Sequence, residues 1–496
     1  MNWSTWLPPL VVASSLLPGL IIFFLVEEKV LFRTALNLAG ALSTLLLTGW
    51  MLWGVSHGHQ YETSVPFLPG LELVLRADPL SLLFVSLSSI LWLLTTIYAI
   101  GYLEGSPHRS RFFGFFSLCV TSTTGIALSG NFITFLLFYE FLTLVTYPLV
   151  IHRGTEKARQ AGKIYLIYTI TSGAILLLGT MWLYTLTGTL DFRPQGILRD
   201  LGEENHLALI VIFILLIAGL GVKAALVPLH GWLPQAMVAP APVSALLHAV
   251  AVVKAGAFGI VRVVYDIFGV DFAADLGVTG PLAVVAAVTI IYGSLRALFQ
   301  DNLKRRLAFS TVSQVSYIIL GVAIAGPVAS IGGIVHLVHQ GLMKITLFFC
   351  AGNLAETLGI HTVHEMNGAG RRMPWSMTAF TIGAFGMIGA PPIAGFISKW
   401  YLGLGALQAG QYWVIPVLIG SSLLNAAYFL PVLHRIWFRE PPDAWPAERD
   451  FGNKETAWAL LVPPLVTALL ALLAGLMASA WFSPLEWVQF IAQREF

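Results

Sequence analysis

Long apolar segments recur along the whole chain and are separated by short polar connections. A helix needs about 20 apolar residues to cross a bilayer, so this pattern predicts membrane-spanning helices. No polar stretch between the segments is long enough to fold alone. We therefore expect an all-α polytopic membrane protein with one membrane domain over residues 1–496. The fourteen predicted spans are 8–26, 31–55, 80–102, 112–130, 131–151, 162–188, 207–229, 240–265, 279–299, 308–325, 329–355, 374–403, 412–437 and 457–481.

Composition supports a membrane location. Hydrophobic residues make up 57% of the chain and charged residues 10%, whereas soluble domains carry about 25% charged residues. This excludes a cytosolic enzyme, and the net charge of +2 leaves no basic surface for nucleic acid. Cys119 and Cys350 lie in apolar runs and are interpreted as buried apolar side chains, not as metal ligands. A loose dinucleotide-binding pattern at 219–224 follows no strand, so no cofactor is predicted.

The distribution of lysine and arginine predicts the orientation in the membrane. Fourteen crossings place both termini on one face. Eighteen of the 27 basic residues fall on the opposite face and four on the terminal face. Because basic residues favour the cytoplasmic side, we expect both termini outside a bacterial or archaeal cytoplasmic membrane. The five remaining basic residues lie within predicted spans: Lys223, Lys254, Arg262, Lys344 and Lys399.

The four lysines and Glu140 are the main candidates for function. Each charge at a helix centre costs roughly 2.5–3.5 kcal/mol on insertion scales, so these groups must be paired, neutralised or in contact with internal water. A buried lysine can release its proton near neutral pH, which suits proton transfer. Lys399 lies off the helix centre and could instead extend to the interface, and Glu140 could be a structural partner of a lysine. Arg262 lies near a helix end, and its side chain is expected to reach the interface.

Histidines accompany two of these lysines. His336 and His339 share a helix with Lys344, and at 100° per residue the three could line one broad polar face. Histidine exchanges protons near neutral pH, so this face is a candidate relay. His248, six residues before Lys254, is a further candidate. All three histidines could instead be hydrogen-bonded core residues.

Two predicted spans are interrupted by glycine and proline, one around Lys223 and one ahead of Lys399. Paired interrupted helices mark the ion sites of inverted-repeat transporters. Five spans separate the two interruptions, and an odd shift inverts the topology. We therefore expect inverted five-helix repeats over 112–265 and 279–437. The predicted hinge residues are Gly221, Pro228, Pro391 and Pro392.

Two sequence strings resemble a known family. GVKAALVPLHGWLPQAMVAPAPVSALLHAVAVVKAG, together with Glu140 in the fifth span, resembles the antiporter-like subunits of Mrp-type cation/proton antiporters and of proton-pumping respiratory complex I. GAPPIAGFISKWYLG is most similar to the D-type branch of the Mrp antiporters. The resemblance covers nearly the whole chain. It implies fourteen helices, two inverted repeats that each form a half-channel, and partner subunits in a multisubunit membrane complex.

The resemblance also implies roles for individual residues. Glu140 and Lys223 would form a pair whose opening and closing tunes the proton affinity of the lysine, and Lys254 would bridge the two repeats. His336, His339 and Lys344 would continue the pathway to Lys399. The chain departs from the family pattern at Gln235, where an acidic residue is common.

Together these features predict a proton-translocating subunit of an Mrp-type Na⁺/H⁺ antiporter, a secondary transporter with no catalytic site of its own. Its transported ions would be protons and Na⁺. An alternative is a proton-pumping subunit of an NADH:quinone oxidoreductase or a membrane-bound hydrogenase, with the redox chemistry in other subunits. A third is a structural subunit that has lost transport. Retention of five membrane charges argues against the third, because a structural role gains little from their cost.

Overall fold

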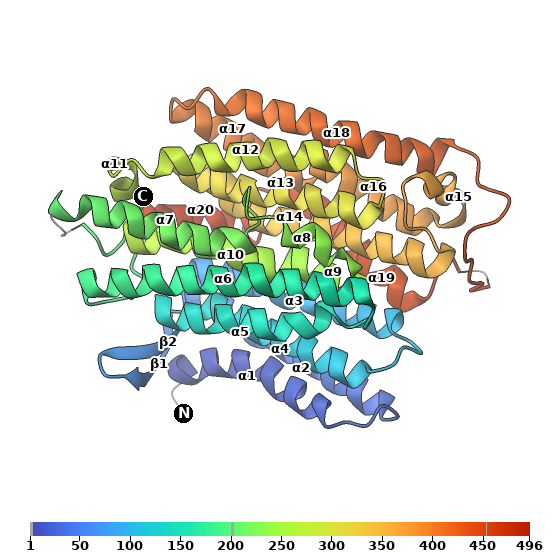
Figure 1. The fold of residues 1–496 in the computed structure, drawn as a ribbon, viewed down its shortest axis with the longest axis horizontal. Coiled ribbons are helices and arrows are strands. Elements are labelled where there is room, and N and C mark those ends of the chain that lie inside the picture. The colour runs from blue at the N-terminus through green and yellow to red at the C-terminus, as the bar shows by residue number, and fades with distance from the viewer. Residues whose placement is uncertain (1–2, 200–202, 453) are drawn as a thin grey trace.

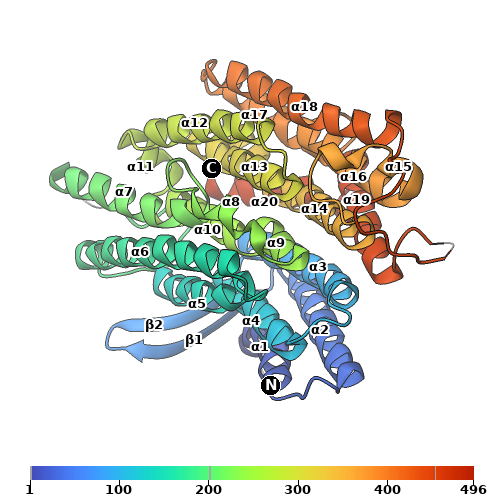
Figure 2. The same ribbon diagram turned by 45° about the vertical axis from the view of Figure 1, so that its right-hand side comes forward.

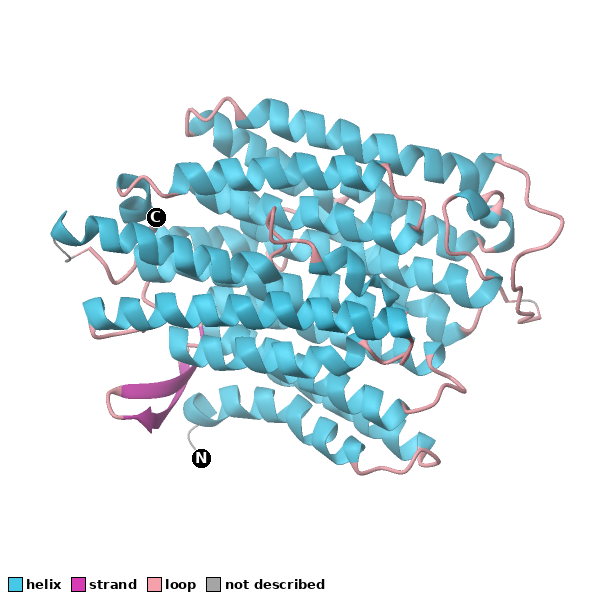
Figure 3. Cartoon of the chain, viewed as in Figure 1, coloured by secondary structure: helices cyan, strands magenta, loops and turns pink. Residues whose placement is uncertain are grey.

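The computed structural model describes residues 3–199, 203–452 and 454–496. Long helices lie side by side, with α1 at one edge of the bundle and α18 at the other (Figure 1). Within the described residues, thirteen helices are long and apolar enough to cross a membrane. The remaining predicted span, 374–403, is built from two shorter helices. The predicted helical membrane architecture is therefore confirmed, and Figure 3 shows a mostly helical chain with a short β-hairpin.

Most predicted spans are single continuous helices: α1 (Trp3–Phe23), α2 (Val30–Ser56), α3 (Pro79–Tyr102), α4 (Arg109–Leu128), α5 (Phe132–Val150), α6 (Glu156–Thr187), α7 (His206–Lys223), α12 (Thr279–Leu298), α13 (Leu303–Ala323), α14 (Pro327–Leu358), α18 (Val414–Phe438) and α19 (Trp458–Leu476).

Other spans are divided. The eighth predicted span comprises α9 (Ala241–Ala245), the π-helical η3 (Leu246–Val250), α10 (Val252–Arg262) and the π-helical η4 (Val263–Phe268). The twelfth comprises α16 (Pro374–Ile388) and α17 (Ala394–Gln408). Short helices outside the spans are η1 (Glu203–Asn205), α8 (Trp232–Gln235), η2 (Ala236–Val238), α11 (Val270–Asp275), η5 (His364–Met366), α15 (Ala369–Arg372) and α20 (Pro484–Glu495).

Polar side chains fix where several spans begin. The Asp78 carboxylate accepts a 2.8 Å hydrogen bond from the amide of Ser81 at the start of α3. The Asn131 side chain accepts one of 3.0 Å from the amide of Thr134 at the start of α5. Such caps satisfy amides that have no partner within the helix, and they define its first turn.

The centre of the bundle is formed by the 241–268 segment, α13 and α14, whose most apolar stretches are completely buried. By contrast, only 28% of the most apolar stretch of α2 is buried. The early helix α3 packs beside the late helices α14 and α19 (Figure 2). A polar side chain on a central helix cannot reach lipid headgroups or bulk water, so it needs partners inside the protein.

A β-hairpin adds to the expected helices. Strands β1 (Tyr61–Leu68) and β2 (Leu71–Ala77) pair antiparallel. They are joined by Pro69 and Gly70, and the positive φ of Gly70, +80°, is one that glycine adopts readily at the third position of a tight turn. The hairpin lies at the same end of the bundle as both termini (Figure 1). We call this the terminal end. The opposite end, which carries α15 and the connection after α18, is the basic end.

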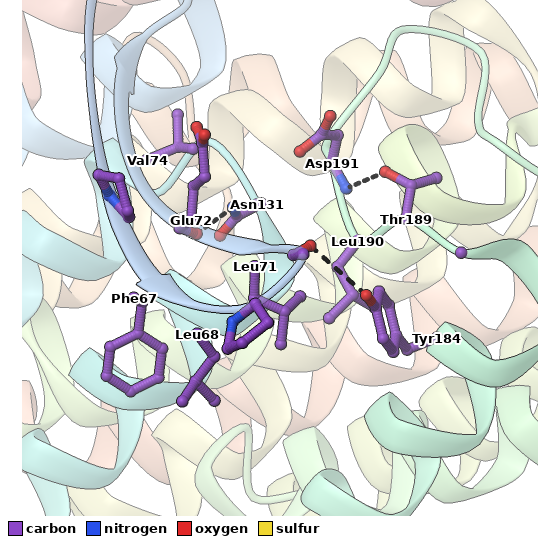
Figure 4. Close-up of a pocket in the computed structure, with 14 residues that line it drawn as sticks. Phe67, Leu68, Leu71, Glu72, Val74, Asn131, Tyr184, Thr189, Leu190 and Asp191 are labelled. Carbon is purple, nitrogen blue, oxygen red and sulfur yellow. Dashed lines mark hydrogen bonds between the residues drawn. The ribbon is translucent and has the colours of Figure 1, made fainter.

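A cavity of about 700 Å³ lies between the hairpin and the end of α6 (Figure 4). The Tyr184 hydroxyl donates a 3.4 Å hydrogen bond to the Gly70 carbonyl across it. The Asn131 amide donates one of 2.8 Å to the Glu72 carbonyl. None of the predicted site residues lines this cavity, so it is separate from the buried charges.

Candidate functional site

The first interrupted helix places Lys223 inside the protein. Helix α7 ends at Lys223, which is completely buried. Its ammonium group donates a hydrogen bond to the Tyr139 carbonyl and lies 3.3 Å from the centre of the Tyr139 ring. The carbonyls at the end of α7 carry a partial negative charge, which favours a cation in this last turn. Trp232 donates a 2.7 Å hydrogen bond to the Val222 carbonyl and satisfies part of the interrupted backbone.

Glu140 lies next to this junction but forms no ion pair with Lys223 within 4.0 Å among the described residues. Its Oε1 atom is buried and has no hydrogen-bond partner in the described chain. Glu140 is nevertheless the charged group whose field acts on Lys223. The carboxylate packs on Gly173 of α6, where a methyl group would overlap it. The two residues of the predicted pair are therefore neighbours in the fold, but they form no ion pair within 4.0 Å.

The central lysine, Lys254, connects the two halves of the bundle. It is completely buried on α10, and its ammonium group donates a 2.7 Å hydrogen bond to the Leu337 carbonyl on α14. The adjacent His336 has Nδ1 at 2.8 Å from the Ser398 hydroxyl and Nε2 at 3.1 Å from Oε1 of Gln314. His336 therefore joins three helices, α13, α14 and α17, directly beside the Lys254 contact.

A continuous series of hydrogen bonds begins at Lys344. Its ammonium group donates to the Ser310 hydroxyl at 2.7 Å. The Tyr428 hydroxyl lies 2.8 Å from that of Ser310 and 2.6 Å from Oδ1 of Asn425. The Asn425 amide in turn donates to the Met387 carbonyl at 3.1 Å. This series ends at the second interrupted helix.

Lys399 completes the series at that interruption. Its ammonium group donates to the carbonyls of Met387 at 3.1 Å and Ile388 at 2.9 Å, and to the Ser422 hydroxyl at 3.0 Å. These carbonyls end α16, where the helix dipole favours a cation. Gly389 has φ of +93°, and a Cβ atom there would lie 2.8 Å from Cδ of Lys399. The side chain therefore points into the protein and does not extend to the interface.

Two predicted relay histidines lie outside this series. The His248 ring stacks on Phe348 with centroids 4.6 Å apart. Neither ring nitrogen of His248 has a hydrogen-bond partner within the described residues, and the His339 ring lies near the backbone of Ala394. Both side chains are completely buried. Neither histidine is a member of the connected series, and their relay role stays a prediction.

The expectation that Arg262 reaches the interface is wrong. Its side chain is completely buried and pairs with Asp78 at 2.8 Å and Asp266 at 2.9 Å. Arg494 of α20 also reaches Asp266, at 3.5 Å. The start of α3 and the end of η4 bring the two carboxylates to Arg262, so the charge is paired inside the protein and does not need to reach water.

The predicted hinge residues lie at or within the two interruptions. Gly221 is in the last turn of α7, and Pro228 is in the irregular segment that follows. Pro391 and Pro392 lie between α16 and α17. The interruptions themselves are confirmed, whereas movement at these residues stays a prediction.

Sequence reasoning missed the uncharged members of the site. Gln314 and Asn425 could have been found, because amide side chains are costly in apolar spans. Ser310, Ser398 and Tyr428 carry no such signal, since these residue types are common in membrane helices. The described residues contain no group of three or more His, Cys, Asp or Glu side chains placed to hold a metal ion.

Completely buried cations at the centre of an apolar helical bundle are the mark of a membrane transport subunit. Comparison with known proteins agrees with this class. Residues 129–424 match the family described as NADH:quinone oxidoreductase/Mrp antiporter, and residues 70–113 match the N-terminal region of complex I chain 5. The chain belongs to the NADH:quinone oxidoreductase/Mrp antiporter family of membrane subunits.

Two curated relatives cover nearly the whole chain. It is 35% identical to the N-type subunit of NADH-quinone oxidoreductase from Desulforudis audaxviator, over 95% of each chain. It is 30% identical to the D-type subunit of the Na⁺/H⁺ antiporter from Bacillus subtilis, over 95% of this chain and 93% of that protein.

Two solved structures share the fold. A chain of the Mrp complex from Dietzia has a TM-score of 0.83 at 24% identity, covering 100% of this chain and 98% of that one. A chain of the archaeal membrane-bound sulfane sulfur reductase has a TM-score of 0.86 at 24% identity, covering 99% of each.

Proposed function

We propose that this chain is the proton-translocating subunit of an Mrp-type Na⁺/H⁺ antiporter and works with partner subunits in a membrane complex. The observation that carries the proposal is the series of hydrogen bonds between Lys344 and Lys399, whose intermediate members are completely buried. The complete pathway comprises Glu140, Lys223, Lys254, His336, His339, Lys344 and Lys399, with His248 as a side branch.

Proton transfer along this pathway needs groups that both accept and donate. The hydroxyls of Ser310 and Tyr428 can do so, whereas the Asn425 amide and the carbonyls that hold Lys223, Lys254 and Lys399 only position the neighbouring groups. Buried polar atoms without partners need water. Both side-chain polar atoms of Gln340 are in this position within the described chain, so bound water would complete the steps between the lysines.

Glu140 would act as the gate. An ionised carboxylate stabilises the proton held by Lys223, and a neutral or displaced one releases it. Moving one charge across 100 mV is worth about 2.3 kcal/mol. A change in the interaction between Glu140 and Lys223 can supply an energy of this size. Glu140 and Lys223 form no ion pair among the described residues, which supports an assignment of this conformation to the open state of the gate.

The arrangement in the membrane belongs to the same proposal. The segments 112–265 and 279–437 would be inverted repeats, each providing a half-channel that opens to one face. Both termini would lie outside the cytoplasmic membrane. Support comes from the two interruptions, each of which brings a lysine to the carboxyl end of a half-helix. Lys223 is the last residue of α7, and Lys399 donates hydrogen bonds to the last carbonyls of α16.

A redox-driven proton pump is the second candidate. The 35% identity to an N-type subunit of NADH-quinone oxidoreductase favours it. Its proton pathway would be the same, and the driving reaction would take place in partner subunits.

A single experiment separates the two candidates. Inverted vesicles containing the whole complex are given Na⁺ pulses without a redox substrate, and proton movement is followed with a fluorescent dye. Na⁺-dependent proton release that Lys223→Ala abolishes supports the antiporter. Proton movement only after addition of an electron donor contradicts it and supports the pump. Unchanged flux in Lys223→Ala under both conditions would refute the pathway itself.

A further inference from the structure

A second cavity, of about 420 Å³, opens at the basic end of the bundle. It lies where the end of α3, the connection between α5 and α6, the start of α13 and the end of α14 meet. None of the proposed relay residues lines it. Four basic residues do: Arg153, Lys157, Lys304 and Arg305.

These four cations have no opposite charge beside them. No carboxylate of the described residues lies within 4.0 Å of their side-chain nitrogens. In the part of the chain that the structure describes, the Arg153 guanidinium donates to the Tyr102 hydroxyl at 3.3 Å, and the Lys304 ammonium group donates to the Ala239 carbonyl at 2.5 Å. The field of Arg153 acts on Lys304, so the two charges are close enough to repel each other.

The acidic residues around the cavity have other partners. Glu356, near the end of α14, pairs with Arg449 at 3.3 Å. Asp301, beside the start of α13, contacts His364. Neither carboxylate lines the cavity. The fold therefore gathers four basic side chains around one hollow, and none of them forms an ion pair among the described residues.

Such a site favours an anion with several acceptor oxygens. Phosphate accepts charge-assisted hydrogen bonds from arginine and lysine together, and it can take two from one guanidinium. Three of the four cations are exposed at the rim, while Lys304 is half-buried below them. A basic hollow between membrane helices on the positively charged side also suits an anionic lipid headgroup.

We propose that this cavity binds a phosphate group, carried either by an anionic phospholipid or by a soluble anion. Lys304 holds the phosphate within the cavity, and Arg153, Lys157 and Arg305 hold it at the rim. This inference does not depend on the proton pathway, because the two sites share no residue.

The test measures binding to the purified complex in a neutral detergent. Short-chain phosphatidylglycerol, short-chain phosphatidylcholine and inorganic phosphate are each titrated by calorimetry. We expect saturable binding of phosphatidylglycerol that weakens with added salt. The double variant Arg153→Gln/Lys304→Gln should lower its affinity about tenfold or more, the effect of losing charge-assisted hydrogen bonds.

Two further variants make the result decisive. Lys157→Gln/Arg305→Gln changes only exposed side chains, so it tests the site even if the first variant is unstable. Arg439→Gln removes an exposed charge at the basic end outside the cavity and should change nothing. Inorganic phosphate binding as tightly as phosphatidylglycerol, with the same sensitivity, would assign the site to a soluble anion. No binding of either probe, or equal weakening by Arg439→Gln, would overturn the proposal.

Discussion

Lys344 and Tyr428 both contact the Ser310 hydroxyl: the Lys344 ammonium group donates to it at 2.7 Å, and the Tyr428 hydroxyl lies 2.8 Å from the same oxygen. The lysine on α14 is thereby joined to α18, the helix at the outer edge of its half of the bundle (Figure 1). In the proposed pathway, this contact would carry a proton from the central Lys344 toward α18.

Removing the Tyr428 hydroxyl should interrupt this connection. Tyr428→Phe keeps the ring and leaves Ser310 without its onward partner, so we expect proton flux to fall about tenfold or more. The measurement is dye quenching in inverted vesicles that contain equal amounts of assembled complex. Tyr184→Phe, which removes a hydroxyl at the hairpin, is the control and should transport normally. Equal flux in the two variants would show that protons bypass Tyr428.

The gate can be tested through charge and through position. Glu140→Gln removes the charge at nearly constant shape and should abolish transport while the complex still assembles. Gly173→Ala keeps the carboxylate but forces it to move, because the new methyl group overlaps it. We expect a reduced rate from this variant. The matched control is Gly49→Ala, whose new methyl group meets no atom within 4 Å. Normal transport by Glu140→Gln would contradict the gating role.

Gly389 should be needed to position Lys399. Alanine at this left-handed position costs about 1–2 kcal/mol, and its Cβ would also crowd the lysine chain. Gly410→Ala has the same backbone penalty at φ of +69° but no neighbour within 4 Å. We therefore expect Gly389→Ala to lose transport and Gly410→Ala to lose only stability, as measured by flux and by thermal unfolding of the complex. Equal flux in both would show that the glycine serves only the backbone.

The buried Arg262 should stabilise the fold. Arg262→Met leaves Asp78 and Asp266 buried without their main partner, and breaking such a pair costs about 3–5 kcal/mol. We expect a lower melting temperature for the purified complex. Adding Asp78→Asn and Asp266→Asn to Arg262→Met should restore part of the lost melting temperature. Arg193→Met breaks an exposed pair with Asp191 and should have little effect. A melting temperature unchanged by Arg262→Met would contradict this assignment.

Docking of α20 should depend on pH through Glu495. Burial and the nearby Asp266 raise the pKa of Glu495 to about 7, and their combined effect outweighs the attraction of Arg494, which lowers it. In the docked helix, Glu495 therefore keeps its proton up to about pH 7. In the undocked helix, it loses the proton near its ordinary pKa of 4.5. Docking is favoured below that value and weakens as pH rises toward 7.

Hydrogen exchange of the α20 amides measures this effect. We expect faster exchange at pH 8 than at pH 5 once the intrinsic pH dependence is removed, and no such difference in Glu495→Gln. Glu486→Gln, on the first turn of the same helix, should behave like the unchanged protein. A pH effect that persists in Glu495→Gln would assign it to another group.

Much of the site was predictable because charge in an apolar span is rare and costly. Glu140 and the four lysines stand out for this reason, and glycine and proline mark the two interruptions. Arg262 was misjudged because its partners, Asp78 and Asp266, are ordinary residues near helix ends. Only their distance in the fold shows that they form a buried cluster.

The sequence by itself determined the class of protein, the number of spans, the two interruptions and the charged candidates for the proposed pathway, because each depends on the cost of placing a residue type in lipid. Only the tertiary structure decided which groups connect. Ser310, Tyr428 and Asn425 lie on two helices more than a hundred residues apart, and hydroxyl and amide groups cost too little to be recognised as functional alone. Whether a polar side chain is a link or an ordinary core residue depends on which groups the packing of distant helices places within hydrogen-bonding distance of it.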